Sequence, residues 1–235
     1  MTKPGAWIKR QIPVRTFQGW DHARPGCLEI DLVAHCGWTT EGARLQTLTL
    51  IDVATGWTEC LPLLCRGHDT FIPALDRARQ ILTFPVIARD TDNGGEFINA
   101  ELLAYCAREA LTFTRGGTGK KKHPRCVSRC SVEQKNGSIV RQLVGDDRFE
   151  GEGAYRQLSE LYRAVRLSVN FSQPSMKLVT KHREGSAVRR TSAPAKTPFR
   201  RLVESGVLKA ETEQRLDELA QALDPVRLLR QLQLL

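Results

Sequence analysis

The order of strand-like and helix-like segments is the feature that most restricts how this chain can fold. Three segments rich in alternating apolar and β-branched residues follow one another at 28–36, 44–55 and 57–64, each bounded by turn-forming residues. Connections this short join neighbouring antiparallel strands. The first part of the chain therefore predicts an antiparallel meander.

The next part of the chain alternates between helical and strand patterns. Apolar spacing predicts a helix over 69–83 and a short buried strand over 84–90, and the same two patterns recur at 98–110 and 111–115. Strands joined through helices pair in parallel. The sequence therefore predicts an α/β fold with a mixed five-stranded sheet flanked by helices.

The remaining residues predict more helices, interrupted by one basic segment. A helix is expected over 132–145, with Ile139, Val140 and Leu143 as its apolar residues, and a strongly amphipathic helix over 153–173. The expected divisions are a basic lead-in over 1–26, a core over 27–175, and a basic C-terminal segment over 176–235 that ends in helices over 209–223 and 224–235.

The composition favours a polyanionic partner. The formal net charge is +9 at pH 7, and nucleic acid is the commonest partner of a chain with such a balance. No apolar run approaches the ~20 residues that span a bilayer, and the first residues lack the apolar core of a signal peptide. We therefore expect a cytoplasmic protein that acts neither on a membrane nor on a small-molecule substrate.

Three acidic residues stand where a metal site could form. Asp31 lies inside the first predicted strand, Asp92 follows the fourth within RDTDNGGEF, and Glu133 begins the helix over 132–145. An acid in an apolar strand is costly to bury unless it is paired or binds a metal. Carboxylate oxygens suit Mg²⁺ or Mn²⁺. Asp90, on the strand face of Asp92, is expected either beside this site or in solvent.

Each of these acids also has a purely structural interpretation. Asp31 could be a strand acid held in an ion pair. The Asn-Gly pair after Asp92 is typical of a tight turn, and Glu133 suits the first turn of a helix, where the dipole favours an acid. The residue patterns alone do not join the three into one site.

Five stretches of the sequence together resemble the catalytic core of bacterial insertion-sequence transposases of the DDE type, which are relatives of retroviral integrases. These stretches are EIDLVAHCG, LTLIDVATGWTE, DTDNGGEFIN, VEQKNGSIVRQLVG and VNFSQPSMKL. The resemblance implies an RNase H-like fold and a catalytic triad of Asp31, Asp92 and Glu133. It also implies that Asp31 and Asp92 share one Mg²⁺ ion and that Asp31 and Glu133 hold a second, with Mn²⁺ as a substitute.

The family reaction sets the expected function. It is metal-dependent cleavage at a transposon end, followed by attack of the freed 3′-OH on target DNA. The implied partners are transposon-end and target DNA, with several copies of the chain assembled on them. The family carries an end-recognition region upstream of the core, and we expect this chain to lack it.

Basic residues on both sides of Glu133 are the candidate DNA contacts. Lys121 and Lys122 lie in the loop before it, and Lys135 and Arg141 lie on its own helix. Cations in such positions neutralise backbone phosphates and make binding salt-dependent. A solvated helix face is the alternative for Lys135 and Arg141. For 177–201 the alternatives are contact with DNA, a bridge between subunits, or a disordered basic tail.

The loop over 116–131 departs from the family pattern. It separates the second and third acids by more residues than is typical, and it lacks the expected Tyr and Asn-Asp. The departure puts catalysis in question more than the fold. The first alternative function is therefore a catalytically inactive transposase remnant that binds only DNA or other subunits. A second is an RNase H-like nuclease with another substrate.

Overall fold

The computed structural model describes most of the chain. The described residues are 6–14, 24–65, 68–91, 94, 97–115, 130–184 and 187–234. Three of the predicted site residues, Asp92, Lys121 and Lys122, lie outside them.

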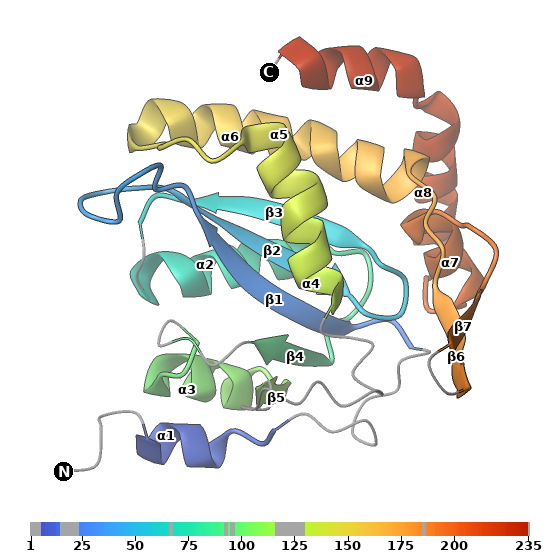
Figure 1. Cartoon of the computed structure of the whole chain (residues 1–235). Helices are drawn as coiled ribbons and strands as arrows, with labels where there is room; N and C mark the ends of the chain where they lie inside the picture. The colour runs from blue at the N-terminus through green and yellow to red at the C-terminus, as the bar shows by residue number, and fades with distance from the viewer. Residues whose placement is uncertain are drawn as a thin grey trace.

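A mixed five-stranded sheet forms the centre of the molecule (Figure 1). The strands lie in the order β3-β2-β1-β4-β5. β1 pairs antiparallel with β2, and β2 with β3, whereas β4 pairs parallel with both β1 and β5. The strands are β1 Cys27–Ala34, β2 Gln46–Asp52, β3 Thr58–Leu63, β4 Ala88–Thr91 and β5 Thr112–Arg115. This order, with these directions, is the RNase H-like arrangement, so the predicted fold class is confirmed.

Helices cover both faces of the sheet (Figure 1). α2 and α3 lie on one face, and α4, η1 and α6 lie on the other. The bounds of these and the remaining helices are α1 Ala6–Gln11, α2 His68–Ile81, α3 Ala100–Arg108, α4 Cys130–Lys135, η1 Asn136–Arg141, α5 Gln142–Val144, α6 Gly151–Leu167, η2 Ser168–Ser172, α7 Pro198–Glu204, α8 Ala210–Ala222 and α9 Pro225–Leu234. Within the described part of the chain, no helix is long and apolar enough to cross a bilayer.

Local sequence explains where several helices begin. The side chain of Asn99 accepts a hydrogen bond from Leu102 N at 2.7 Å, which caps α3. Thr197 caps α7 by accepting from Arg200 N, and Pro198 occupies the first helical position, where its missing N–H costs nothing.

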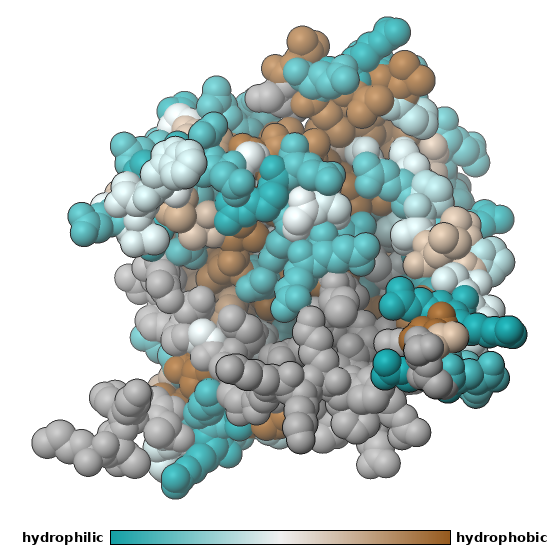
Figure 2. All heavy atoms as spheres, viewed as in Figure 1, coloured by the Kyte–Doolittle hydropathy of each residue, from teal (hydrophilic) through white to brown (hydrophobic). Residues whose placement is uncertain are grey.

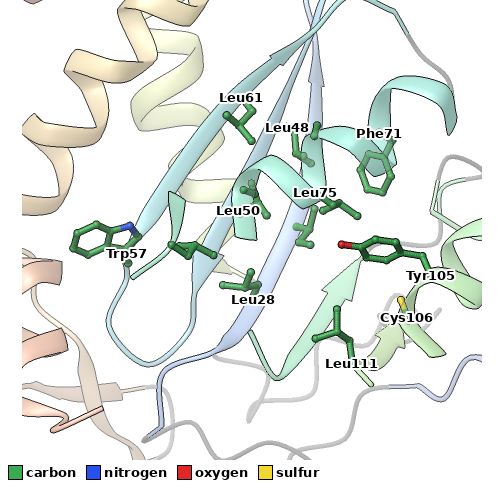
Figure 3. Packing of buried hydrophobic residues seen from close by; sticks show 14 of the residues in the cluster. Leu28, Leu48, Leu50, Trp57, Leu61, Phe71, Leu75, Tyr105, Cys106 and Leu111 are labelled. Carbon is green, nitrogen blue, oxygen red and sulfur yellow. The ribbon is translucent and has the colours of Figure 1, made fainter. Parts of the chain in front are cut away.

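The sheet has an apolar face, formed by Leu28, Ile30, Leu48, Leu50 and Leu61, which packs against α2 and α3. Figure 3 shows leucines of this face pointing toward Phe71 and Leu75 of α2 and Tyr105 of α3. Side chains alternate along a strand, so every second residue of β1 and β2 enters this core. Fully burying one leucine contributes about 1.5–3 kcal/mol, so this face supplies much of the stability of the fold.

The opposite face of the sheet, formed by Glu29, Asp31, Thr47, Thr49 and Cys60, is called the mixed face here. The register pairs Asp31 with Thr49, and Thr49 with Cys60, so these side chains point to one side. It lies under α4, η1 and α6, which add their own apolar cluster. One strand therefore contributes leucine and isoleucine to one layer and two acids to the other.

The helix predicted over 132–145 is not a single regular helix. It begins as α4 at Cys130 and continues through the π-helical turn η1, in which Gln142 N–H donates to Gly137 O. Gly137 lowers the stability of a regular helix at this point. The wide turn places Ile139 and Val140 in the core but leaves Leu143 43% exposed, so Leu143 is not part of the buried side.

The strand predicted over 84–90 begins only at Ala88. Pro85 has no N–H to give to a ladder, and Phe84 is buried in the apolar core. The N–H groups of Ile87 and Ala88 both donate to Gly26 O, at 2.8 and 3.2 Å, which starts the pairing with β1.

The basic segment over 177–201 is structured, so a disordered tail is the wrong interpretation. It forms a two-stranded antiparallel hairpin of β6 Leu178–Glu184 and β7 Ala187–Ser192, followed by α7. Phe199 and Leu202 of α7 and Leu216 of α8 belong to the same apolar cluster as the leucines of the sheet. Residues on both sides of the division predicted at 175/176 thus pack in one apolar cluster. The division itself stays a prediction.

The outer edge of the sheet, β3, is closed by a side chain. Asn170 of η2 donates through Nδ2 to Thr58 O and accepts through Oδ1 from Thr58 N, both at 2.8 Å. The amide thus pairs with the strand backbone as a neighbouring strand would. Asn170 is fully buried and belongs to the stretch VNFSQPSMKL.

Candidate active site

Strand β1 presents two acids on the mixed face. Glu29 is 2% exposed, whereas Asp31 is half-buried. The parallel register with β4 pairs Glu29 with Asp90, so Asp90 shares their face, and it pairs Ile30 with Thr91. The two strands thus bring three acids to one side of the sheet.

Asp90 is buried rather than solvent-facing. It is 4% exposed, and its Oδ1 accepts a hydrogen bond from Thr114 Oγ1 of β5 at 2.8 Å. The expectation that Asp90 could lie in solvent is therefore wrong. A hydroxyl partner on the neighbouring strand offsets part of the cost of burying this carboxylate.

Two hydrogen bonds attach the continuous helical segment of α4 and η1 to β1, one from each element. Val132 N–H donates to Glu29 Oε2 at 3.4 Å, and Asn136 Nδ2 donates to Asp31 Oδ2 at 2.7 Å. Glu133 directly follows Val132 and precedes Asn136 by three residues, so it neighbours Asn136 on the helix surface. The two contacts therefore hold the turn that carries Glu133 onto the strand that carries Asp31.

The carboxylate of Asp31 is oriented from two directions. Its Oδ1 accepts from Leu32 N at 2.9 Å, and its Oδ2 accepts from Asn136. An ionised carboxylate has about four lone-pair sites, so a carboxylate that accepts hydrogen bonds can also ligate a metal ion. The sequence interpretation did not name Asn136, although its place three residues after Glu133 in VEQKN is a usable signal.

The donor chemistry of the described acids fits a hard divalent cation. Asp31 and Glu133 supply carboxylate oxygens, which Mg²⁺ and Mn²⁺ prefer. Among the residues whose positions are described, no group of three or more His, Cys, Asp or Glu side chains is placed to hold a metal ion. Asp92, the third predicted ligand, is not among those residues.

Lys135 and Arg141, the two described candidate DNA contacts, are both partly engaged within the chain. Lys135 is half-buried, and burial lowers the pKa of its ammonium group. Arg141 donates through Nη2 to Ala34 O at 3.4 Å, and its Nη1 lies 2.9 Å from Asp146 Oδ1. A role in DNA binding stays a prediction for both.

A buried polar chain supports the mixed face beyond Asp31. His35 Nε2 lies 2.7 Å from Thr47 Oγ1, which lies 2.5 Å from the hydroxyl of Tyr162 on α6. Burial, with a smaller effect from Arg141, lowers the pKa of His35 from its usual 6.5 to about 4. The imidazole is therefore neutral at pH 7. Sequence patterns gave no indication of this series of polar contacts, because its three residues lie far apart in sequence.

Comparison with known proteins yields one sequence relative. No protein-family model matches the chain. It is 41% identical over 194 residues to the uncharacterised protein y4rM of Sinorhizobium fredii (strain NBRC 101917 / NGR234). The match covers 83% of this chain and 54% of the relative, so the chain spans about half the length of this curated relative.

Solved structures similar to the chain include retroviral integrase catalytic cores. The core of HTLV-2 integrase, solved with magnesium in a dimeric form, is 15% identical, covering 66% of this chain and 93% of that one at a TM-score of 0.48. The core of BIV integrase is 17% identical, covering 77% and 95% at a TM-score of 0.49. Because both scores are below 0.5, the RNase H-like assignment rests on the strand order and directions given above.

Proposed function

We propose that this chain is the core of a DDE-type transposase or integrase that cleaves and joins DNA strands with divalent metal ions. One observation carries the proposal: Val132 of α4 donates to Glu29 of β1, and Asn136, the first residue of η1, donates to Asp31 of β1. This attachment brings the helix of the third family acid to the strand of the first.

The register of β1 and β4 supports the inclusion of Asp92. The pairing runs as far as Ile30 with Thr91, and the next residues along the two segments are Asp31 and Asp92. Paired residues of parallel strands lie side by side with their side chains on one face. Continuation of the register by one residue would join the two acids.

In this proposal Asp31, Asp92 and Glu133 hold Mg²⁺, or Mn²⁺ as a substitute, through their carboxylate oxygens. Bound metal ions would activate the attacking oxygen and stabilise the leaving oxygen of the phosphodiester. Asn136 keeps the Asp31 carboxylate in a fixed orientation, and Glu29 fixes the first turn of α4. Both therefore act on the geometry of the triad rather than on DNA.

DNA is the proposed partner, both as transposon ends and as target, with several copies of the chain assembled on it. Lys121, Lys122, Lys135 and Arg141 are the proposed phosphate contacts near the triad. For Arg141, binding would require the guanidinium to exchange Asp146, an exposed partner, for a phosphate. A cytoplasmic location follows from the same proposal.

The altered sequence of 116–131 favours one competing function. In that alternative the same fold binds DNA or other subunits without cleaving DNA. The two functions differ in one measurable property, which is metal-dependent breakage of a DNA strand.

The test is a nicking and joining assay on supercoiled plasmid with a labelled duplex that ends in a free 3′-OH. With Mg²⁺ or Mn²⁺ we expect nicked plasmid and labelled joint products, and Asp31→Asn should lower both rates by roughly 10²–10⁴-fold, the equivalent of several kcal/mol of transition-state stabilisation. Glu160→Gln removes an exposed carboxylate on α6 and serves as the matched control. Activity equal in wild type and Asp31→Asn would refute the triad. Binding to DNA without any nicking would favour the inactive remnant.

A further inference from the structure

The β6–β7 hairpin carries exposed cations on both of its faces. Arg183, Arg189 and Arg190 are all exposed, as is every residue of β7. Adjacent residues of a strand point to opposite faces, so Arg189 and Arg190 lie on different sides of the hairpin. Glu184 is the single acid between residues 178 and 192. Figure 2 shows hydrophilic residues over the lower right of the molecule, where Figure 1 places this hairpin.

The many basic residues of β6 and β7 do not stabilise the pairing of these two strands. The register places Lys181 opposite Arg190, and no described pair sets an acid opposite a cation. Like charges directly across a strand pair destabilise it, and opposite charges would have stabilised it. The cations therefore suit an external partner better than they suit the hairpin.

The base of the hairpin is fixed to the rest of the protein. Lys177 Nζ donates to Val53 O at 2.6 Å and also to Ala54 O, both in the β2–β3 turn. Ala193 N–H donates to Lys177 O at 2.8 Å, which closes the open end of the hairpin. An isolated two-stranded hairpin is at best marginally stable in water. The anchored base lets the cationic part extend from the body of the molecule.

We propose that the β6–β7 hairpin is a second DNA-binding surface, which lies in a groove of duplex DNA and contacts the phosphates on both of its walls. A two-stranded ribbon fits the major groove. Cations on both faces match a site with phosphates on two sides, whereas a flat anionic surface would engage one face only. The choice of DNA as the polyanion rests on the proposed function.

The test measures binding of a fluorescent random-sequence duplex by anisotropy, over a series of salt concentrations and in EDTA. The slope of log affinity against log salt is about −0.9 per neutralised phosphate. If each arginine neutralises one phosphate, replacing Arg183, Arg189 and Arg190 with alanine should reduce the slope by about 2.7. A triple glutamine variant provides a second form, with longer polar side chains and the same loss of charge.

The matched control replaces Arg156, Arg163 and Arg215 with alanine. These arginines are exposed on α6 and α8, so the control has the same change in net charge at another surface. A slope that falls only in the two hairpin variants supports the proposal. Equal changes in hairpin and control variants would mean that net charge alone drives binding, and an unchanged slope in both hairpin variants would exclude the surface. Both of these results overturn the proposal.

The result is independent of catalysis because EDTA removes divalent ions. Asp31→Asn should keep the wild-type salt slope even if it loses all nicking. Failure of the nicking assay together with a hairpin-specific slope would leave this surface intact and refute only the enzymatic function. Normal nicking activity together with an unchanged salt slope in the hairpin variants would refute this surface and leave the enzymatic function intact.

Discussion

The two faces of the central sheet are built from the same strands but are stabilised by different interactions. On the apolar face, Leu28 and Ile30 of β1 are packed against α2 and α3, and both are 2% exposed. On the mixed face, Glu29 of the same strand accepts a hydrogen bond from α4, and Asp31 accepts one from η1. Stability on one face is a matter of buried area, whereas on the other it depends on individual polar contacts.

This difference determines how each face should respond to substitution. A substitution that leaves a cavity in the apolar face removes buried apolar area and packing contacts, which lowers the free energy of unfolding of the whole fold. Loss of one polar partner on the mixed face leaves a carboxylate or a ring less constrained, with a smaller and more local cost. Four substitutions test this contrast in order of decreasing effect.

The largest effect is expected for Leu48→Ala on the apolar face. Leu48 is 0% exposed, so the change should lower the free energy of unfolding by about 3 kcal/mol. Urea denaturation monitored by circular dichroism measures it. Leu48→Met, which keeps the volume, should cost less than about 1.5 kcal/mol. Similar costs for the two variants would mean that packing on this face is looser than the structure indicates.

His35, which extends the mixed face, should give the chain a pH-dependent stability. Its pKa is about 4 in the folded protein, against 6.5 when unperturbed, so between these values only the unfolded chain takes up the proton. The free energy of unfolding should therefore fall as the pH drops from 6.5 to 4, by up to about 3 kcal/mol from this residue.

Urea denaturation at several pH values tests the role of His35. His35→Gln should show a shallower decline than wild type across this window. His182→Gln, which alters an exposed histidine, serves as the matched control. Parallel curves for His35→Gln and wild type would show that His35 also takes up the proton in the folded state.

Glu29→Ala should loosen the start of α4 while leaving the apolar face intact. Loss of the acceptor for Val132 N–H should lower the local opening free energy by about 1–2 kcal/mol. Hydrogen exchange of the amides in α4 measures this change. Glu29→Gln retains an oxygen acceptor and should restore most of the protection. Equal exchange in all three proteins would show that Glu29 does not hold the helix.

The smallest effect on stability is expected for Asn136→Ala, at about 1 kcal/mol for one hydrogen bond. Its larger consequence, under the proposed function, is on the metal. Loss of a partner that orients a ligand typically weakens metal binding about 10–100-fold. Titration of nicking activity with Mg²⁺ should show this shift, whereas Ser138→Ala, an exposed position on η1, should not. An unchanged titration would mean that Asp31 is oriented without Asn136.

The sequence predicted the apolar face better than the mixed face. Alternation along β1 and β2 and helical spacing in α2 are local patterns, and they predicted the strands, the helices and a mixed sheet. The RNase H-like fold was implied by the family resemblance. The contact of Asn136 with Asp31 joins residues 105 apart, and no local pattern shows it. The hairpin was also missed, because its strands lack the apolar residues that mark a buried strand.

The amide of Asn170 has a consequence for self-association. An edge strand with free N–H and C=O groups can recruit a strand from another molecule and begin aggregation. On β3, Thr58 is already paired with Asn170, and Pro62 lacks an N–H to offer. The two residues therefore act as blocks near either end of the strand. At the β3 edge, the sheet therefore offers little free backbone on which a strand of another molecule could pair.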